Sequence, residues 1–192
     1  MNNTPDSLRF TDYGPRSTFD VSRLISRLRR NHALEHATMT VLSERQRGLR
    51  LVGRSSLWGF YIYGAVSTES LLAAAQEGLR RLKAGQRRMA IHPNCGTNLA
   101  VAGILAGLGA FLTLGISIRN RVSQKKFGFW EWLAHLPLAC TAAMLGIVVA
   151  RPLGPALQAH VTTQADVGDL ALVGVTREEK GGVVVHHVRT EG

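Results

Sequence analysis

Two apolar segments, residues 99–118 and 132–150, constrain this chain most, because neither contains a charged side chain. Each has about the 20 residues that an α-helix needs to cross a bilayer. Trp130 and Trp132 stand at the entrance of the second segment, a position typical of aromatic interface anchors. A buried core hairpin is the alternative, but so much uncharged apolar chain exceeds what a domain of this size would enclose. We therefore expect a transmembrane helical hairpin in contact with the lipid bilayer.

The first apolar segment carries Gly103 and Gly107 four residues apart. This small-xxx-small spacing lets another helix approach closely within a membrane. We therefore expect these two glycines to support close helix packing and a homo-oligomer.

The chain has a formal net charge of +10. Many of its basic residues flank the first apolar segment, five between positions 80 and 88 and four between 119 and 126. Basic flanks of this kind favour anionic lipid. The chain shows no zinc-finger spacing, aromatic ribonucleoprotein strand or glycine-lysine phosphate loop, so we expect no specific nucleic-acid partner.

The location of the front part of the chain follows from its N-terminus. No apolar stretch precedes Val21, which predicts neither a secretory signal nor an N-terminal anchor. We expect a multi-pass protein of the bacterial inner membrane with a cytoplasmic front domain. This orientation would send the basic loop 119–128 across the bilayer, against the positive-inside bias. Two re-entrant or in-plane helices would avoid that conflict, and the sequence leaves both arrangements open.

Two amphipathic helices are indicated before the apolar segments. Residues 1–20 are polar and lack periodicity, which predicts a flexible tail. Asp20 is a suitable N-cap for a helix that continues to Gly48, with a break allowed near Asn31. Ser67 or Thr68 caps the second helix, which stops at Gly85.

Strand-like pieces surround these helices. We expect strands at residues 49–53, 60–66 and 87–93, and a C-terminal β-hairpin whose turn is Gly181-Gly182 and which extends the same sheet. The predicted fold class is α+β: a small two-layer domain of helices on an antiparallel sheet, with a membrane hairpin and a C-terminal β-hairpin. The expected domains are the tail (1–20), the α+β domain (21–98), the transmembrane hairpin (99–150) and the C-terminal segment (151–192).

The first helix contains His32, Glu35 and His36 in the pattern H-x-x-E-H. At 100° per residue these three side chains share one narrow face, so both imidazoles can reach one metal ion with the carboxylate beside it. There are two alternative interpretations. His32 and His36 are ordinary polar residues of the helix face near a domain boundary, or the three residues form a structural hydrogen-bonded network in which Glu35 neutralises a histidine.

A catalytic zinc site needs a third protein ligand and an open position for water. Glu69, in the first turn of the second helix, is one candidate, although the helix dipole alone explains a glutamate there. His92 and Cys95 are the others, because they lie in the turn-rich segment HPNCGTN just before the first apolar segment. The sequence leaves all three open.

The pentapeptide HALEH resembles the active-site signature of inverzincins, the pitrilysin-like metallopeptidases. The resemblance implies that His32 and His36 bind zinc and that Glu35 is the general base. It also implies a glutamate as the third ligand, but the spacing to Glu69 departs from that family. The segments NHALEHAT, GFYIYGAVSTE and AIHPNCGTN, followed by two apolar helices, resemble an uncharacterised family of short bacterial membrane proteins, a domain of unknown function.

These features lead to one functional hypothesis and one alternative. The hypothesis is a membrane-bound, metal-dependent hydrolase, specifically a zinc peptidase that acts on membrane proteins or peptides close to the bilayer. The alternative is a non-catalytic metal-binding, assembly or interaction module that the helical hairpin anchors.

Overall fold

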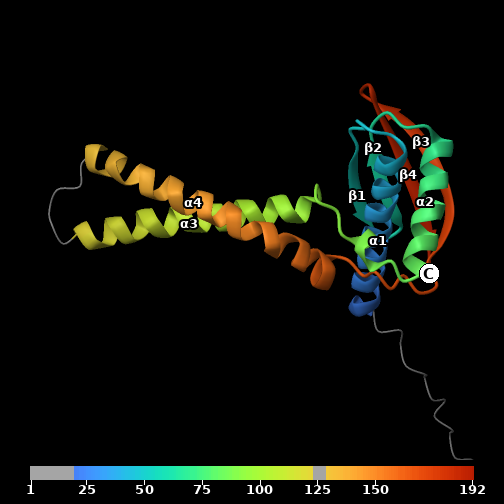
Figure 1. The fold of residues 1–192 in the computed structure, drawn as a ribbon, viewed down its shortest axis with the longest axis horizontal. Coiled ribbons are helices and arrows are strands. Elements are labelled where there is room, and N and C mark those ends of the chain that lie inside the picture. Colours follow the sequence, from blue (N-terminus) through green and yellow to red (C-terminus); the bar gives the residue numbers. More distant parts are fainter. Residues whose placement is uncertain (1–19, 123–128) are drawn as a thin grey trace, which may run out of the picture.

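The computed structural model describes residues 20–122 and 129–192. The tail expected over 1–20, apart from Asp20, and most of the loop expected over 119–128 lie outside these ranges. The elements are α1 (Val21–Arg45), β1 (Val52–Ser56), β2 (Gly59–Tyr63), α2 (Thr68–Lys83), η1 (Arg87–Ala90), α3 (Gly96–Val122), α4 (Phe129–Leu157), η2 (Gln158–Thr162), β3 (Ala171–Lys180) and β4 (Val183–Glu191). They form a globular unit from which α3 and α4 project as a long arm (Figure 1).

The sheet has four antiparallel strands in the order β1-β2-β4-β3. The C-terminal hairpin forms as predicted, with Lys180 paired to Val183 across Gly181 and Gly182, both of which have positive φ. This hairpin joins the front domain because β4 pairs with β2. The predicted α+β class, with two apolar helices and a C-terminal strand hairpin, is confirmed.

The core lies between one face of the sheet and the helices α1 and α2. Asp20 caps α1 by accepting a hydrogen bond from the Ser22 backbone N–H, and Ser67 caps α2 in the same way. The two helices approach closely at Gly78, where a Cβ atom would lie 3.1 Å from Ala37. The largest fully buried apolar side chains are Phe60, Leu34, Leu42, Ile62, Leu71 and Leu170.

The structure corrects three expectations in this part of the chain. The strand expected over 87–93 is instead the short 3-10 helix η1, because β4 takes the place beside β2 while Met89 and Ala90 are buried against α1. The first strand lies at 52–56 and not at 49–53, since only Leu57 and Trp58 separate it from β2. Helix α1 is unbroken at Asn31, whose amide donates to the carbonyl oxygens of Ser56 and Leu57.

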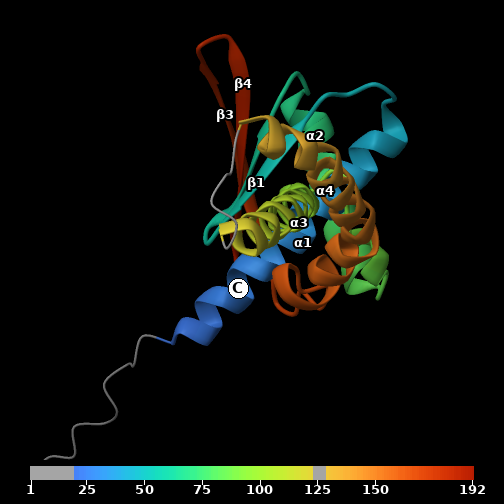
Figure 2. The ribbon, with the colours of Figure 1, turned by 90° about the vertical axis from the view of Figure 1, so that its left-hand side faces the viewer.

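The arm consists of two helices long and apolar enough to cross a membrane, with candidate spans at Gly96–Gly115 and Leu133–Thr162. In the most apolar stretches of these two spans, only 0% and 11% of the residues are buried, so the arm is not part of the globular core. Figure 2 looks along the arm and shows the two helices side by side. Helix α4 continues past residue 150, through Pro152 and Pro155.

Close contact between α3 and α4 occurs at Gly109 and Gly146, where an added Cβ would lie 2.8 Å and 2.6 Å from the backbone of the facing helix. At Gly103 and Gly107, by contrast, a Cβ would meet no atom within 4 Å. These two glycines therefore do not make the contact within the hairpin, and a homo-oligomer through them stays a prediction.

Candidate metal centre

The H-x-x-E-H pattern lies in the middle of α1, where the helix packs against the sheet. His36 is 1% exposed and Glu35 is 4% exposed, while His32 is half-buried. All three side chains line one cavity of about 390 Å³. Its other walls are Met39 of α1, residues 51–55 at the start of β1, and His92 with residues 94–97, before and at the start of α3. The cavity therefore lies where the globular unit meets the arm.

Backbone carbonyl groups fix the orientation of the two α1 imidazoles. His32 Nδ1 lies 2.9 Å from the Thr162 oxygen, and His36 Nδ1 lies 2.7 Å from the Ala90 oxygen. A carbonyl oxygen only accepts, so each Nδ1 carries a proton, and Nε2 is the ring atom that is left for a metal ion. Metal-binding histidines characteristically have such a second hydrogen bond, which fixes the tautomer.

Cys95 completes a group of three donors. Its Sγ lies 3.5 Å from His32 Nε2, and one ligand atom from each of His32, His36 and Cys95 lies within 4.8 Å of the others. Burial alone would raise the pKa of the Cys95 thiol, but the hydrogen bonds of its sulfur with His32 and the Thr97 backbone N–H, together with the nearby His36 ring, bring this pKa down to about 5. The sulfur is therefore a thiolate at neutral pH, which is the form that binds metals.

These three residues can hold a metal ion. The Nε2 atom of His36 is buried and has no hydrogen-bond partner within the described residues, although burying an unpaired polar atom is costly. A metal ion at this position would pair with that nitrogen. Two imidazoles and one thiolate are a donor set that suits zinc among other transition metals, and these three residues would hold the ion.

Glu35 lies beside these three residues and lines the same cavity. One carboxylate oxygen, Oε2, accepts a hydrogen bond of 2.6 Å from the Ser55 hydroxyl. The other, Oε1, occupies space that exists only because residue 53 is glycine, since a Cβ there would collide with it. Burial raises the pKa of Glu35 above its ordinary value, although Ser55 and the two imidazoles oppose that shift.

His92 lines the same cavity but is arranged differently from the other two histidines. Its Nδ1 accepts a hydrogen bond of 3.3 Å from the Asn94 backbone N–H, so its proton resides on Nε2. Burial and the nearby His36, whose ring centroid lies 5.9 Å away, lower the pKa of His92. His92 is therefore a neutral hydrogen-bond donor at this cavity, whereas His32 and His36 each point Nδ1 at a carbonyl oxygen.

The structure does not bring Glu69 to the cavity. This side chain is exposed in the first turn of α2. Its negative charge acts on His186 of β4, where it partly offsets the lowering of the His186 pKa that burial causes. Of the three candidates for a third ligand, Cys95 lies with the α1 histidines, His92 lies next to them, and Glu69 lies apart.

The sequence analysis missed several residues that position this site. The carbonyl groups of Ala90 and Thr162 carry no side-chain signature, so no motif could have indicated them. Gln158 is fully buried, and its side chain accepts from the His92 backbone N–H at 2.8 Å and donates to Asn98 at 2.6 Å. A glutamine after an apolar segment was the only available signal for this link.

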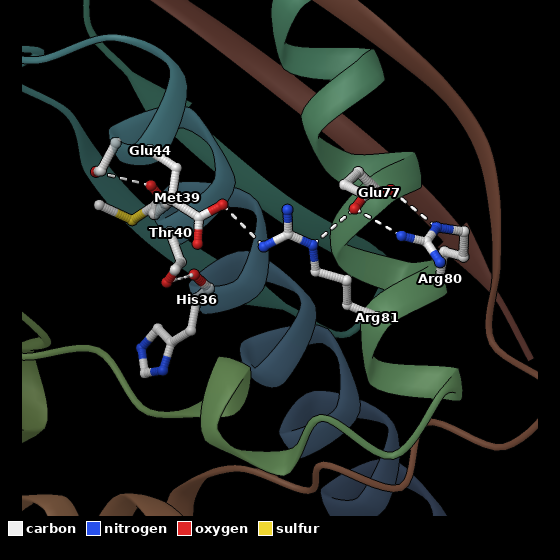
Figure 3. A network of polar contacts seen from close by, with 8 residues as sticks. His36, Met39, Thr40, Glu44, Glu77, Arg80 and Arg81 are labelled. Atoms are coloured by element: carbon white, nitrogen blue, oxygen red, sulfur yellow. Dashed lines mark hydrogen bonds and ion pairs between the residues drawn. The ribbon is translucent and has the colours of Figure 1, made fainter.

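An ion-pair network holds α1 against α2 beyond the site. Arg81 on α2 contacts Glu44 on α1 at 2.8 Å and Glu77 on its own helix at 2.6 Å. In Figure 3 the ring of His36 points away from this network. The network therefore fixes the second half of α1 and leaves the metal-binding face free.

Comparison with known proteins places this arrangement in a family. The family model described as a domain of unknown function, DUF6391, matches residues 27–175. The chain belongs to this family. The DUF6391 region contains all the cavity-lining residues, both apolar helices and the residues of η2.

A relative of the chain is an uncharacterised protein of Picosynechococcus sp.. It is 32% identical over 172 residues, which cover 84% of this chain and 78% of the relative. No solved structure matches the chain.

Proposed function

We propose that this protein is a membrane-bound zinc hydrolase that cleaves polypeptides at the membrane surface. The observation that carries the proposal is the convergence of two carbonyl-oriented imidazoles and a thiolate on one cavity that also holds a buried carboxylate. The H-x-x-E-H order, which resembles that of inverzincins, supports the same assignment.

His32, His36 and Cys95 hold the zinc ion in this proposal. A zinc ion supplies a Lewis acid and lowers the pKa of a bound water molecule toward 7. The chain supplies the remaining groups. Glu35 Oε2 is held by Ser55, and the raised pKa of Glu35 makes its carboxylate a better proton acceptor than an exposed glutamate. Glu35 is accordingly the general base.

His92 provides a donor for the charge that develops on the attacked carbonyl oxygen. Its proton lies on Nε2, and its lowered pKa keeps the ring neutral at pH 7. A neutral, prepositioned N–H donor stabilises an oxyanion without a competing titration. We therefore assign His92 as an oxyanion donor and not as a ligand.

An extended polypeptide is the substrate that the cavity wall favours. Strand β1 is at the edge of the sheet, paired on one side with β2, and residues 51–55 line the cavity beside Glu35. A sheet edge binds an extended peptide through its free backbone N–H and C=O groups. A peptide added to β1 would thus run past the candidate metal centre.

The membrane location restricts which polypeptides reach the site. Cys95 directly precedes α3, the first candidate span, so the cavity would lie close to the bilayer surface if α3 and α4 cross the membrane. We propose residence in the bacterial inner membrane with the globular domain in the cytoplasm. Substrates would then be membrane proteins or peptides next to the bilayer.

The test is cleavage of a peptide library by zinc-loaded protein in lipid nanodiscs, read by mass spectrometry. Glu35→Gln keeps the size of the side chain and should retain zinc while turnover falls by about 10²–10⁴-fold, the usual contribution of a general base. Ser43→Ala, on the exposed part of α1, is the matched control and should cleave normally. Bound zinc without cleavage, or unchanged cleavage by Glu35→Gln, would refute the hydrolase and favour a non-catalytic metal-binding module.

A further inference from the structure

A second cavity, of about 370 Å³, shares no lining residue with the candidate metal centre. Its walls come from three parts of the chain: Arg29 of α1, residues 87, 88, 90 and 91 in and after η1, and residues 159, 160 and 163–166, which follow α4. The hydrolase proposal makes no use of this cavity.

The cavity is strongly basic. Three guanidinium groups line it, against the single carboxylate of Asp166. Arg87 and Arg88 are exposed, and neither forms an ion pair with any other described residue. Two unpaired guanidinium groups on neighbouring residues favour an anion with several acceptor oxygens, such as a phosphate group.

Arg29 makes the rear wall rigid. Its Nη2 donates to the carbonyl oxygens of His160 and Thr163 at 2.9 Å and 3.0 Å, and the Gln164 backbone N–H donates to the Arg29 carbonyl at 3.0 Å. These bonds tie the segment after α4 to α1. The Nε of Arg29 is buried and has no hydrogen-bond partner within the described residues.

The position of the cavity matches the headgroup layer of a bilayer. The second candidate span runs from α4 through η2 and ends at Thr162, between the cavity-lining residues His160 and Thr163. The candidate span of α3 begins at Gly96, five residues after Ile91, which also lines the cavity. Figure 1 shows the end of α4 close to the lower part of α1. Phosphate groups of lipids occupy this level, just outside the hydrocarbon.

We propose that this cavity binds the phosphate of an anionic phospholipid headgroup. Arg87 and Arg88 would hold the phosphate oxygens against the wall that Arg29 orders. Lipid binding would also fix η1, whose Ala90 carbonyl orients His36. The inference rests on the proposed membrane residence and is independent of hydrolysis.

Native mass spectrometry of the full chain tests the proposal. The detergent is removed from the protein in the spectrometer, and the molecules of phosphatidylglycerol and phosphatidylcholine that stay bound to each chain are counted. The double variant Arg87→Gln, Arg88→Gln should lose about thirty-fold in affinity for phosphatidylglycerol, since each arginine at an anionic surface contributes a factor of about five. Both side chains are exposed, so the fold should persist.

The matched control is Arg45→Gln, Arg47→Gln, which removes the same charge at the other end of α1, about 24 Å from Arg29 along the helix. It should bind phosphatidylglycerol as the parent does. Equal weakening in both double variants would show diffuse attraction and overturn the site. Displacement of the lipid by millimolar inorganic phosphate would overturn the lipid as the ligand. Neither readout involves metal or turnover, so this test fails separately from the hydrolase proposal.

Discussion

Replacing Gly53 by alanine would place a methyl group where the Glu35 carboxylate lies. The new Cβ would be 2.7 Å from Cδ of Glu35 and closer still to Oε1. Ordinary contact between such atoms needs about 3.5 Å, so the carboxylate would have to move by roughly 1 Å or more. Glu35 is only 4% exposed and accepts a hydrogen bond from Ser55, so its side chain has little room to move. Overpacking of this kind costs about 1–3 kcal/mol.

A double-mutant cycle measures that cost without a substrate. Thermal unfolding of metal-free protein in detergent should show that Gly53→Ala lowers Tm by about 2–4 °C per kcal/mol lost. In the Glu35→Ala background the nearest colliding atoms are absent, so Gly53→Ala should cost less than about 0.5 kcal/mol. Gly174→Ala is the control, because a Cβ there meets no atom within 4 Å. Additive effects of the two substitutions would refute the placement of Glu35.

Three further outcomes are expected. The Cys140→Ser substitution removes the other of the chain's two cysteines. In metal-free protein that carries it, Cys95 should alkylate at half its maximal rate near pH 5, since its neighbours His32, His36 and Thr97 outweigh burial and hold its pKa at about 5; a midpoint near pH 9 would contradict this. Two arginines on α2 hold the pKa of Glu77 at about 2, below its ordinary 4.5, so its contribution to stability is present above pH 4.5 and lost as pH falls toward 2. The Tm of the parent should consequently drop further between about pH 5 and about pH 2 than that of Glu77→Gln, and equal drops would count against the network. Gly146→Leu should destabilise the hairpin by about 1–3 kcal/mol in thermal unfolding, whereas Gly103→Leu should cost little, and equal losses would be inconsistent with the observed helix crossing.

Local signals predicted the parts of the fold that local chemistry controls. Asp20 and Ser67 cap their helices because a side-chain oxygen three or fewer residues away satisfies free N–H groups. The shared face of His32, Glu35 and His36 follows from the helical period alone. The two apolar helices were equally predictable, since the length of the segments and their lack of charged residues are enough to indicate them.

The order of the strands in the sheet could not be predicted from the sequence, although the C-terminal hairpin does extend the sheet as expected. The segment 87–93 has strand-like composition, but β4, nearly a hundred residues later, occupies the place beside β2. The choice among Glu69, His92 and Cys95 likewise depended on how the HPNCGTN segment folds back onto α1. That path is fixed by the buried Gln158 from the end of the arm, which no local pattern connects to His92.

The central claim, a metal centre at His32, His36 and Cys95, is tested most directly by elemental mass spectrometry of the detergent-purified protein. We expect near one zinc ion per chain in the parent, none in the His32→Ala, His36→Ala double variant, and a marked loss in Cys95→Ser, with circular dichroism showing that each variant is folded. His135→Ala, in the apolar arm, is the matched control and should keep its zinc. A folded parent that binds no zinc or other transition metal, or a double variant that binds it equally, would contradict the account.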